Sequence, residues 1–269
     1  MTLDTTTKSK TITVTRSGNG TISAVSSNTA AATVSVSGNT VTVTGKANGS
    51  ATITISVAAG TNHTAPASKT CAVTVSFLKD NFADNDWSAI IAACHSSSVP
   101  STWVVGNSTP MTIGGKSYQV DIIGKNHDDY ADGSGKAPLT FQMHTCYATE
   151  YKMNNSGSNT GGWADCLLRT TGGFKIIKSK MPAEVVAALK AVTKKTTAGG
   201  ASSAIDTTED TLFLLSEIEV QGTRTYSYAG EGTQYEYYKT AANRKKNRAW
   251  YLRSPRLNNT SCFDRTGWN

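Results

Sequence analysis

The first 77 residues of the chain contain a closely spaced series of short segments in which β-branched residues alternate with small or polar ones. Turn-forming Gly and Asn residues separate these segments, for example in Ser17–Gly20 and Ser37–Asn39. Alternation with a period of two indicates half-buried strands, and turns at such short intervals are typical of a sandwich. We therefore predict an all-β sandwich for this part of the chain. The expected strands are Thr11–Thr15, Ala32–Val36, Thr40–Thr44, Ala51–Val57 and Cys71–Phe77.

Two neighbouring segments carry a resemblance to a known family. Val34–Gly45 has the sequence VSVSGNTVTVTG, and Gly49–Ile55 has the sequence GSATITI. This succession of strand, glycine, strand and glycine resembles the group 2 bacterial immunoglobulin-like domain over residues 8–77. The resemblance implies an immunoglobulin-like sandwich that serves as a spacer or adhesion module on bacterial surface proteins and phage particles. It implies no catalytic role, and we interpret His63 as a solvated loop residue.

The sequence pattern changes after residue 77. Charged residues appear abruptly in Phe77–Asn85, and apolar residues then recur with helical spacing from Trp87 to Cys94. We therefore predict a sandwich domain over residues 1–77, a linker over residues 78–85 and a second domain over residues 86–269. Within the second domain we expect a helix over Met181–Lys194 and a buried strand over Thr211–Val220.

Two apolar, alternating segments, Tyr118–Gly124 and Ala137–Met143, flank a loop that is rich in side-chain oxygens. Strands that present a polar loop commonly build a binding site, and clustered oxygens are the ligands that calcium prefers. The loop departs from the EF-hand pattern, because Tyr130 and Leu139 stand where ligands are required. The alternative is a solvated loop whose Asp residues cap turns and pair with Lys125 or Lys136. We expect no cofactor, and calcium is the alternative, with the ligands Asn126, Asp128, Asp129 and Asp132.

Four segments of the second domain together resemble another family. They are Ile123–Tyr130 (IGKNHDDY), Gly135–Phe141 (GKAPLTF), Leu214–Ile218 (LLSEI) and Trp250–Arg256 (WYLRSPR). They resemble an uncharacterised C-type-lectin-like domain of gut Firmicutes and their phages, which often follows group 2 immunoglobulin-like modules. The resemblance covers residues 78–269 and implies an α+β C-type-lectin-like domain. Members of that family normally continue to a final apolar strand, whereas this sequence stops at Trp268 and Asn269, so we expect a short or truncated form that lacks that strand.

The superfamily of this lectin-like domain includes enzymes, but their site patterns are not found in the sequence. The formylglycine-generating branch implies a copper site that uses a close pair of cysteines late in the domain. This chain has only Cys262 in that region. The sulfoxide-synthase branch implies an iron site with three histidines, two of them closely spaced. In this chain His127 and His144 lie on separate segments. Ser254 lacks the Gly-x-Ser-x-Gly surroundings of a hydrolase nucleophile. We therefore predict that the protein is not an enzyme. The five cysteines are widely spaced and are interpreted as reduced thiols: Cys71, Cys94, Cys146, Cys166 and Cys262.

The formal charge of +7 is unevenly distributed along the chain. Residues 1–77 carry +4, residues 78–238 carry −4 and residues 239–269 carry +7. The run Lys239–Arg256 contains seven cations and no acid, and aromatic residues lie within and beside it. Such a run can bind nucleic acid or an acidic surface polymer. We favour an anionic glycan over nucleic acid, because the aromatic residues also match the core pattern of the resembling family. Arg253, moreover, can pair with Glu217 or Glu219 inside the domain.

These observations predict a non-enzymatic appendage on the outer surface of a phage virion, in a tail or head fibre or decoration, that binds a host-cell glycan or protein. No apolar run approaches the length of a membrane span, and the N-terminus lacks the features of a secretory signal. We therefore expect synthesis in the bacterial cytoplasm without a signal peptide. We expect other virion proteins as partners, and a homo-oligomer. The alternatives are a bacterial surface adhesin, and a purely structural virion component whose lectin-like domain binds neighbouring subunits.

We expect the ligand-binding residues to lie near the C-terminus, where the retroelement-diversified relatives of the superfamily place their variable residues. Aromatic, Arg and Asn side chains make adaptable contacts at low ordering cost. For Trp250 the alternative is a position in the core. The predicted ligand-binding residues are Arg248, Trp250, Tyr251, Asn258, Asn259, Phe263, Arg265 and Trp268.

Overall fold

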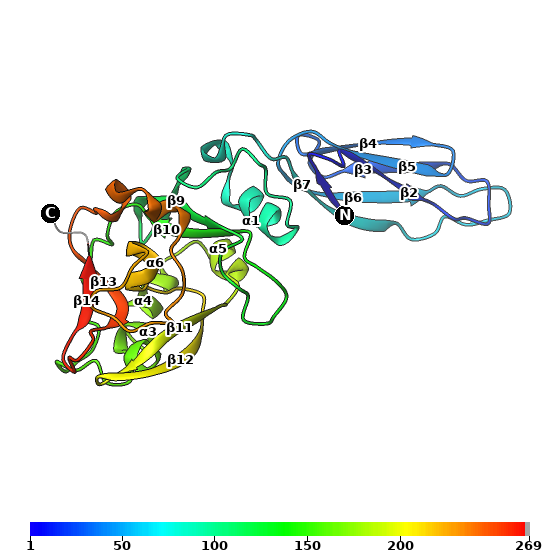
Figure 1. The fold of residues 1–269 in the computed structure, drawn as a ribbon. Helices are drawn as coiled ribbons and strands as arrows, with labels where there is room; N and C mark the ends of the chain where they lie inside the picture. The colour runs from blue at the N-terminus through cyan, green and yellow to red at the C-terminus, as the bar shows by residue number, and fades with distance from the viewer. Residues whose placement is uncertain (267–269) are drawn as a thin grey trace. The chain divides into compact units, whose positions relative to one another are not determined.

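The computed structural model describes residues 1–266 of the chain and divides them into two compact units (Figure 1). The first unit contains Met1–Lys79 and Ser88–Ala93, and the second contains Asp80–Trp87 and the chain from Cys94 onward. The chain therefore leaves the first unit, returns to it within helix α1 (Trp87–His95) and leaves it again. Among residues 1–266 no helix has the length and apolar character that crossing a membrane requires.

The first unit consists of two sheets. The larger sheet has the strand order β1-β7-β6-β3, in which only the β1–β7 pair is parallel, and the smaller sheet has the order β2-β5-β4. Buried residues alternate along β5, as expected for a strand with one face in a core. The strands are β1 (Thr2–Asp4), β2 (Ser9–Thr13), β3 (Ile22–Ser26), β4 (Ala32–Ser37), β5 (Thr40–Gly45), β6 (Gly49–Val57) and β7 (Lys69–Ser76).

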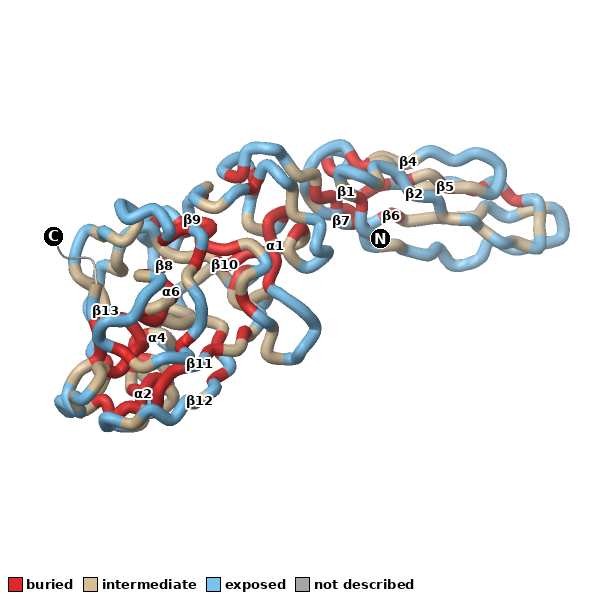
Figure 2. Tube along the Cα trace, in the orientation of Figure 1, coloured by how far each residue is buried: buried red, intermediate tan, exposed pale blue. Residues whose placement is uncertain are grey.

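The core of the first unit combines side chains from both sheets. Val43 of the smaller sheet packs with Ile53, Val73 and Val75 of the larger one, and all are buried. Figure 2 shows the buried parts of the chain in red. The five strands expected from the sequence are present with small shifts of their ends. Strands β1 and β3 were not predicted.

We expect Ile53→Ala to lower the free energy of unfolding of the first unit by about 2–5 kcal/mol, because it opens a cavity in a closed core. Ile53 is 0% exposed, whereas Val25 of the same sheet is 66% exposed. The control Val25→Ala should change the free energy of unfolding by no more than about 0.5 kcal/mol. Denaturant unfolding measures both, and equal losses for the two variants would contradict the assigned core.

The second unit mixes helices with three small antiparallel sheets. The order β10-β9-β8 forms the largest, and β11–β12 and β13–β14 form two ribbons. The strands are β8 (Ser108–Ile113), β9 (Lys116–Lys125), β10 (Leu139–Met143), β11 (Val192–Gly199), β12 (Ser202–Asp210), β13 (Trp250–Pro255) and β14 (Phe263–Thr266). The α-helices are α2 (Gly162–Asp165), α3 (Leu167–Thr170), α4 (Gly173–Ser179), α5 (Ala183–Ala188) and α6 (Glu217–Gln221), with 3-10 helices η1 (Phe82–Asp84), η2 (Glu236–Lys239) and η3 (Ala241–Arg244).

The helix predicted over Met181–Lys194 is too long. Helix α5 ends at Ala188, and β11 begins at Val192, so Lys194 lies in a strand rather than at a helix end. The β-branched residues after Lys190 favour an extended chain, and their pairing with β12 decides the outcome. Lys194 thereby faces the buried interior of the unit.

The buried strand predicted over Thr211–Val220 is also wrong. Helix α6 begins after Ser216, whose hydroxyl accepts the Glu219 N–H while the Glu219 carboxylate accepts the Ser216 N–H. The Ser-x-x-Glu sequence at Ser216–Glu219 is the pattern of this capping box. The apolar residues around it led instead to the prediction of a strand. Gly222 ends the helix in the left-handed conformation, with a φ of 76°.

Candidate ligand-binding site

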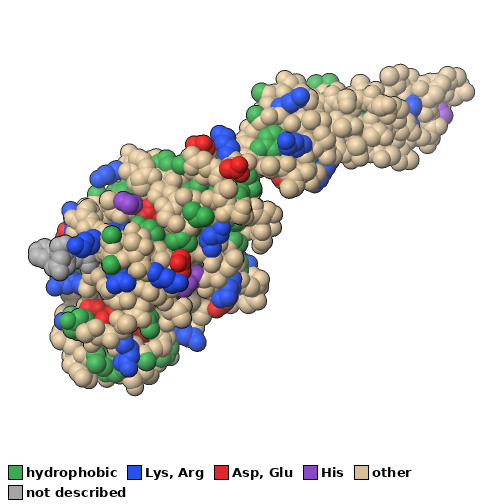
Figure 3. All heavy atoms as spheres, turned by 45° about the horizontal axis from the view of Figure 1, so that its top comes forward, with side chains coloured by type: hydrophobic (Ala, Val, Ile, Leu, Met, Phe, Trp, Pro, Cys, Tyr) green, Lys and Arg blue, Asp and Glu red, His purple; other side chains and the backbone are tan. Residues whose placement is uncertain are grey.

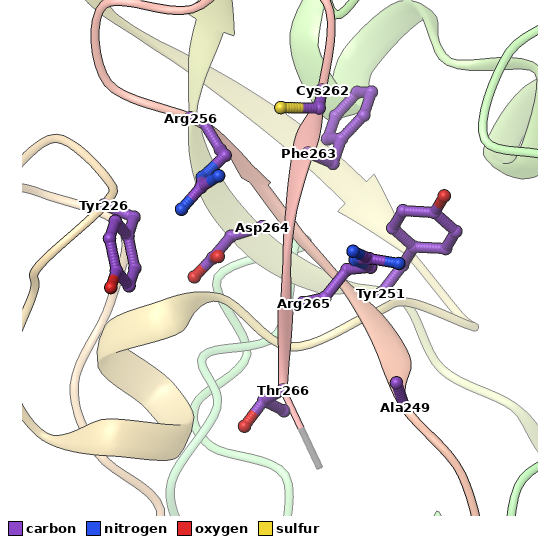
Figure 4. Close-up of a pocket in the computed structure, with 9 residues that line it drawn as sticks. All are labelled: Tyr226, Ala249, Tyr251, Arg256, Cys262, Phe263, Asp264, Arg265 and Thr266. Atoms are coloured by element: carbon purple, nitrogen blue, oxygen red, sulfur yellow. The ribbon is translucent and has the colours of Figure 1, made fainter. Parts of the chain in front are cut away.

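Strands β13 and β14 border a surface hollow of about 810 Å³ (Figure 4). A hollow of this size can hold a small molecule or a few units of a polymer. The nine residues that line it come from β13 and the residue before it, from β14, from the connection between the two strands and from a distant loop. They are Tyr226, Ala249, Tyr251, Arg256, Cys262, Phe263, Asp264, Arg265 and Thr266.

The connection between β13 and β14 is a turn built around Asn259. Its side-chain oxygen accepts the backbone N–H groups of Ser261 (2.8 Å) and Cys262 (3.2 Å). The Asn159 amide donates to the backbone oxygens of Asn259 and Cys262, each over 2.7 Å. The turn is therefore anchored to the body of the unit, and it sets where Arg256 and Asp264 project.

The inner side of β13 is anchored by Arg253, which is fully buried. Its guanidinium donates to both carboxylate oxygens of Glu219, with a distance of 2.8 Å from Nη2 to Oε1. The same group donates to the backbone oxygens of Leu214 (2.9 Å) and Glu231 (3.0 Å) and to the Thr196 hydroxyl (2.8 Å). Of the two partners expected for Arg253, Glu219 is confirmed and Glu217 is not.

Glu217 instead holds the loop that presents Tyr226. Its buried carboxylate accepts the backbone N–H groups of Thr225 (2.8 Å), Tyr226 (3.0 Å) and Ser227 (2.8 Å), and the Ser227 hydroxyl (2.6 Å). Such a set of donors around one anion orders the loop strongly. The exposed Tyr226 ring is thereby placed at the hollow, where the Arg256 guanidinium carbon lies 4.5 Å from the ring centroid.

Asp264 supplies the one carboxylate among the nine lining residues, and the residue is only 6% exposed. Within residues 1–266 no Lys or Arg forms an ion pair with it. Burial raises the pKa of Asp264, and the nearby Glu217 raises it further, against the opposing effects of the Arg265 backbone and Arg256. The carboxyl group lies at the hollow, where it can share further hydrogen bonds with a ligand.

The two flanks of the hollow resemble each other in chemistry. In Figure 4 the side chains of Tyr226, Arg256 and Asp264 lie on one side of β14, and those of Tyr251 and Arg265 lie on the other. Tyr251 and Arg265 are exposed and directly opposite each other in the β13–β14 ladder. Each flank therefore offers an aromatic ring and a guanidinium group, a combination suited to non-covalent binding of a polar ligand with flat faces.

Only some of the eight predicted ligand-binding residues line the hollow in the structure. Tyr251, Phe263 and Arg265 line the hollow, and Phe263 is buried there in a cluster with Trp163. Trp250 is half-buried, with its ring centroid 6.4 Å from that of Tyr238. Arg248 is exposed and forms an ion pair with Glu150 over 2.6 Å. Asn258 and Asn259 belong to the turn described above, and Trp268 lies outside the described residues.

The sequence did not single out Tyr226, Arg256 or Asp264 as ligand-binding residues. Arg256 was counted within the basic run, but nothing in the local pattern marks it as a partner of Tyr226. The pairing depends on Leu257, whose N–H donates to the Tyr226 carbonyl. A contact of this kind between distant segments has no signal in one sequence.

The carboxylates of the loop after β9 each have a lysine partner. Asp129 pairs with Lys136 over 2.7 Å, as expected for this loop, and Asp132 pairs with Lys190 over 3.0 Å. Asp128 is buried and pairs with Lys194 instead of a lysine in its own loop. Asn126 has a φ of 50°, in the left-handed region. Among the described residues no group of three or more His, Cys, Asp or Glu side chains is arranged for a metal, and calcium binding stays an untested alternative.

Comparison with known proteins finds a family that matches the region containing the hollow. Residues 138–266 match a family described as a domain of unknown function, DUF6273. All nine residues that line the hollow, together with Glu217, Glu219 and Arg253, fall within the matched range. No curated protein matches the chain.

We expect Arg253→Ala to lower the free energy of unfolding of the second unit by about 3–5 kcal/mol, because it leaves the buried Glu219 carboxylate without its main partner. The control Arg265→Ala removes an exposed arginine from the adjacent strand and should change this free energy by no more than about 0.5 kcal/mol. Chemical denaturation monitored on the second unit compares them. A loss below 1 kcal/mol for Arg253→Ala, on the order of a surface ion pair, would contradict the role assigned to Arg253.

The Glu219 carboxylate should also make stability depend on pH. Burial raises its pKa, but Arg253 and Lys194 more than offset this effect and bring the pKa from 4.5 to about 2. Because the folded pKa lies below the unfolded one, the stabilisation is complete above pH 4.5 and is lost as the pH falls toward about 2. The difference in free energy of unfolding between the wild type and Glu219→Gln should therefore be largest above this window and shrink within it. A difference that does not change with pH would count against the assignment.

Proposed function

We propose that the protein is a non-enzymatic binding protein on the outer surface of a phage virion and that the β13–β14 hollow binds a saccharide of the host-cell surface. The observation that carries the proposal is the set of groups in the hollow: exposed Tyr226 and Tyr251, the cations Arg256 and Arg265, and the buried Asp264. Sugar rings present C–H faces that pack on aromatic rings, and hydroxyl groups that bond to guanidinium and carboxylate groups. A few fixed polar groups beside apolar surface are what such a ligand requires.

The two-unit organisation supports the proposal. The first unit has the two packed sheets expected of an immunoglobulin-like spacer. The second unit mixes helices with antiparallel strands, as an α+β lectin-like domain does, and it contains the hollow. The immunoglobulin-like and lectin-like identities rest on the sequence resemblances, as does the location on a virion. A spacer followed by a binding domain is a sensible arrangement for an appendage that must reach a cell.

The distribution of cations favours a saccharide over nucleic acid. Within the basic run, Arg253 is buried against Glu219, Arg248 pairs with Glu150 and Lys239 pairs with Glu236. In the view of Figure 3 the Lys and Arg side chains of the second unit are scattered rather than gathered in a stripe. Nucleic-acid binding depends on many phosphate contacts along a continuous surface. Arg256 and Arg265, which form no ion pair within residues 1–266, suit a short anionic or partly anionic saccharide better.

Attachment to a particle would add multivalency. We propose that several copies assemble with other virion proteins, so that weak single sites act together. An anionic saccharide repeated along a bacterial cell wall is the matching ligand. The same hollow would serve a bacterial adhesin, whereas in a purely structural component it would be covered by a neighbouring subunit.

Binding of the full-length protein to immobilised bacterial cell-wall polymers and to a saccharide array tests this function. Tyr226→Ala and Arg265→Ala should each weaken binding about tenfold, equivalent to about 1.4 kcal/mol per contact. The control Arg248→Ala removes an exposed arginine outside the hollow and should leave affinity unchanged. Repeating the measurement with EDTA tests calcium separately, and the loss of binding there would identify a metal requirement.

Two results would overturn the proposal. One is the absence of saturable binding by a folded preparation displayed in many copies. The other is binding that Arg248→Ala weakens as much as Tyr226→Ala does, because the site would then lie outside the hollow. Burial of Tyr226 and Tyr251 in an oligomer of the purified protein would favour the structural role.

A further inference from the structure

A lysine ammonium group and two carboxylates lie together inside the second unit, apart from the hollow. Lys194 in β11 is 3% exposed, and its Nζ contacts Asp128 Oδ1 directly. The same Nζ lies 3.1 Å from Glu219 Oε1 and 2.8 Å from the Tyr235 hydroxyl. Both carboxylates are buried as well. A lysine held this closely against a carboxylate, away from water, is placed for chemistry as well as for ion pairing.

Aromatic rings surround the contact. The Lys194 Nζ lies 4.1 Å from the centroid of Phe213 and 5.2 Å from that of Tyr235, whose other neighbour is the stacked His127 ring at 3.9 Å between centroids. In such surroundings an unpaired ion is costly, and the ammonium and the carboxylate contact each other directly. Glu219 is already balanced by Arg253. Lys194 and Asp128 are therefore a second pair whose charges can be removed together without leaving another charge unpaired.

The two oxygens of Asp128 differ in their surroundings. Oδ1 contacts the lysine, whereas Oδ2 accepts from the Thr140 hydroxyl. The Tyr235 hydroxyl lies between the two oxygens, 2.7 Å from Oδ1 and 2.8 Å from Oδ2. Donors fixed around one oxygen of a carbonyl group stabilise the negative charge that develops there when a nucleophile attacks. The other oxygen, next to the amine, is the one placed to receive protons and depart.

We propose that Lys194 and Asp128 condense to form an intramolecular amide bond between β11 and the loop that follows β9. The ammonium first transfers a proton to Asp128 Oδ1, which gives a neutral amine and a neutral acid. Nζ then attacks Cγ, forming the C–N bond, and charge develops on Oδ2 near Thr140 and Tyr235. Nitrogen loses a second proton to Oδ1, and the C–O bond breaks to release one water molecule. No oxidant, metal or other reactant is needed.

The cross-link would join positions 66 residues apart in the chain. Like a disulfide, it would restrict the unfolded chain and so favour the folded state, and it would resist reducing agents. It would also fix the Arg253–Glu219 pair that lies beside it. The proposal is independent of which ligand the hollow binds.

Intact-mass measurement of the full-length protein is the direct test. The folded wild type should weigh less than its sequence by one water molecule, and Lys194→Arg should show the full mass of its own sequence. A protease digest should contain two peptides joined through Lys194 and Asp128, and the wild type should yield no peptide that ends at Lys194. A succinimide at Asp128 would also lose one water, but it would persist in Lys194→Arg and would join no peptides.

Tyr235→Phe removes one donor to Asp128 and should slow the loss of water, so that the cross-linked fraction after a fixed time is smaller than in the wild type. Tyr237→Phe is the matched control, because the Tyr237 hydroxyl bonds to Asp121, outside the cluster. The proposal is overturned if the wild type, incubated after folding, keeps its full sequence mass and releases the Lys194-terminated peptide in full yield. That result would leave Lys194 and Asp128 as a buried ion pair, and it requires no variant to fold.

Discussion

The buried pair of Arg253 and Glu219 is the interaction on which the second unit depends. Its two charged groups connect β13 with helix α6, and through further hydrogen bonds they reach β11 at Thr196 and the backbone at Glu231. An arginine without solvent access must have its donors satisfied, or the free energy of burial is lost. The elements around Arg253 supply these partners, and the resulting hydrogen bonds connect segments that are far apart in the sequence.

The buried groups beneath β13 and α6 also position the side chains that border the hollow. Because Arg253 and Ser254 tie the inner side of β13 down, Tyr251 faces outward in a defined position. Glu217, the first residue of helix α6, holds the loop of Tyr226 by accepting three backbone N–H groups. Both aromatic groups are thus positioned by buried anions or cations rather than by flexible loops. Preorganisation of this kind reduces the ordering cost of binding.

Local sequence patterns predicted well what depends on local contacts. Strands β4 to β7 follow from alternation and turns, and Glu219 was one of the two partners expected for Arg253. The errors arise where distant contacts decide. Lys194 lies in a strand because β11 pairs with β12. Its ion pair with Asp128 joins residues that are 66 positions apart in the sequence. Tyr226 joins the hollow through Glu217 and Leu257, which one sequence does not reveal.

The central claim is that the hollow bordered by β13 and β14 is the ligand-binding surface. Hydrogen exchange of the full-length protein, with and without a saturating cell-wall saccharide, tests it directly. The account predicts slower exchange in residues 225–227 and 250–266 on binding, with residues 28–31 of the first unit unchanged as an internal reference. Protection confined to the first unit, or to the loop over residues 126–136, would contradict the account and place the binding surface elsewhere.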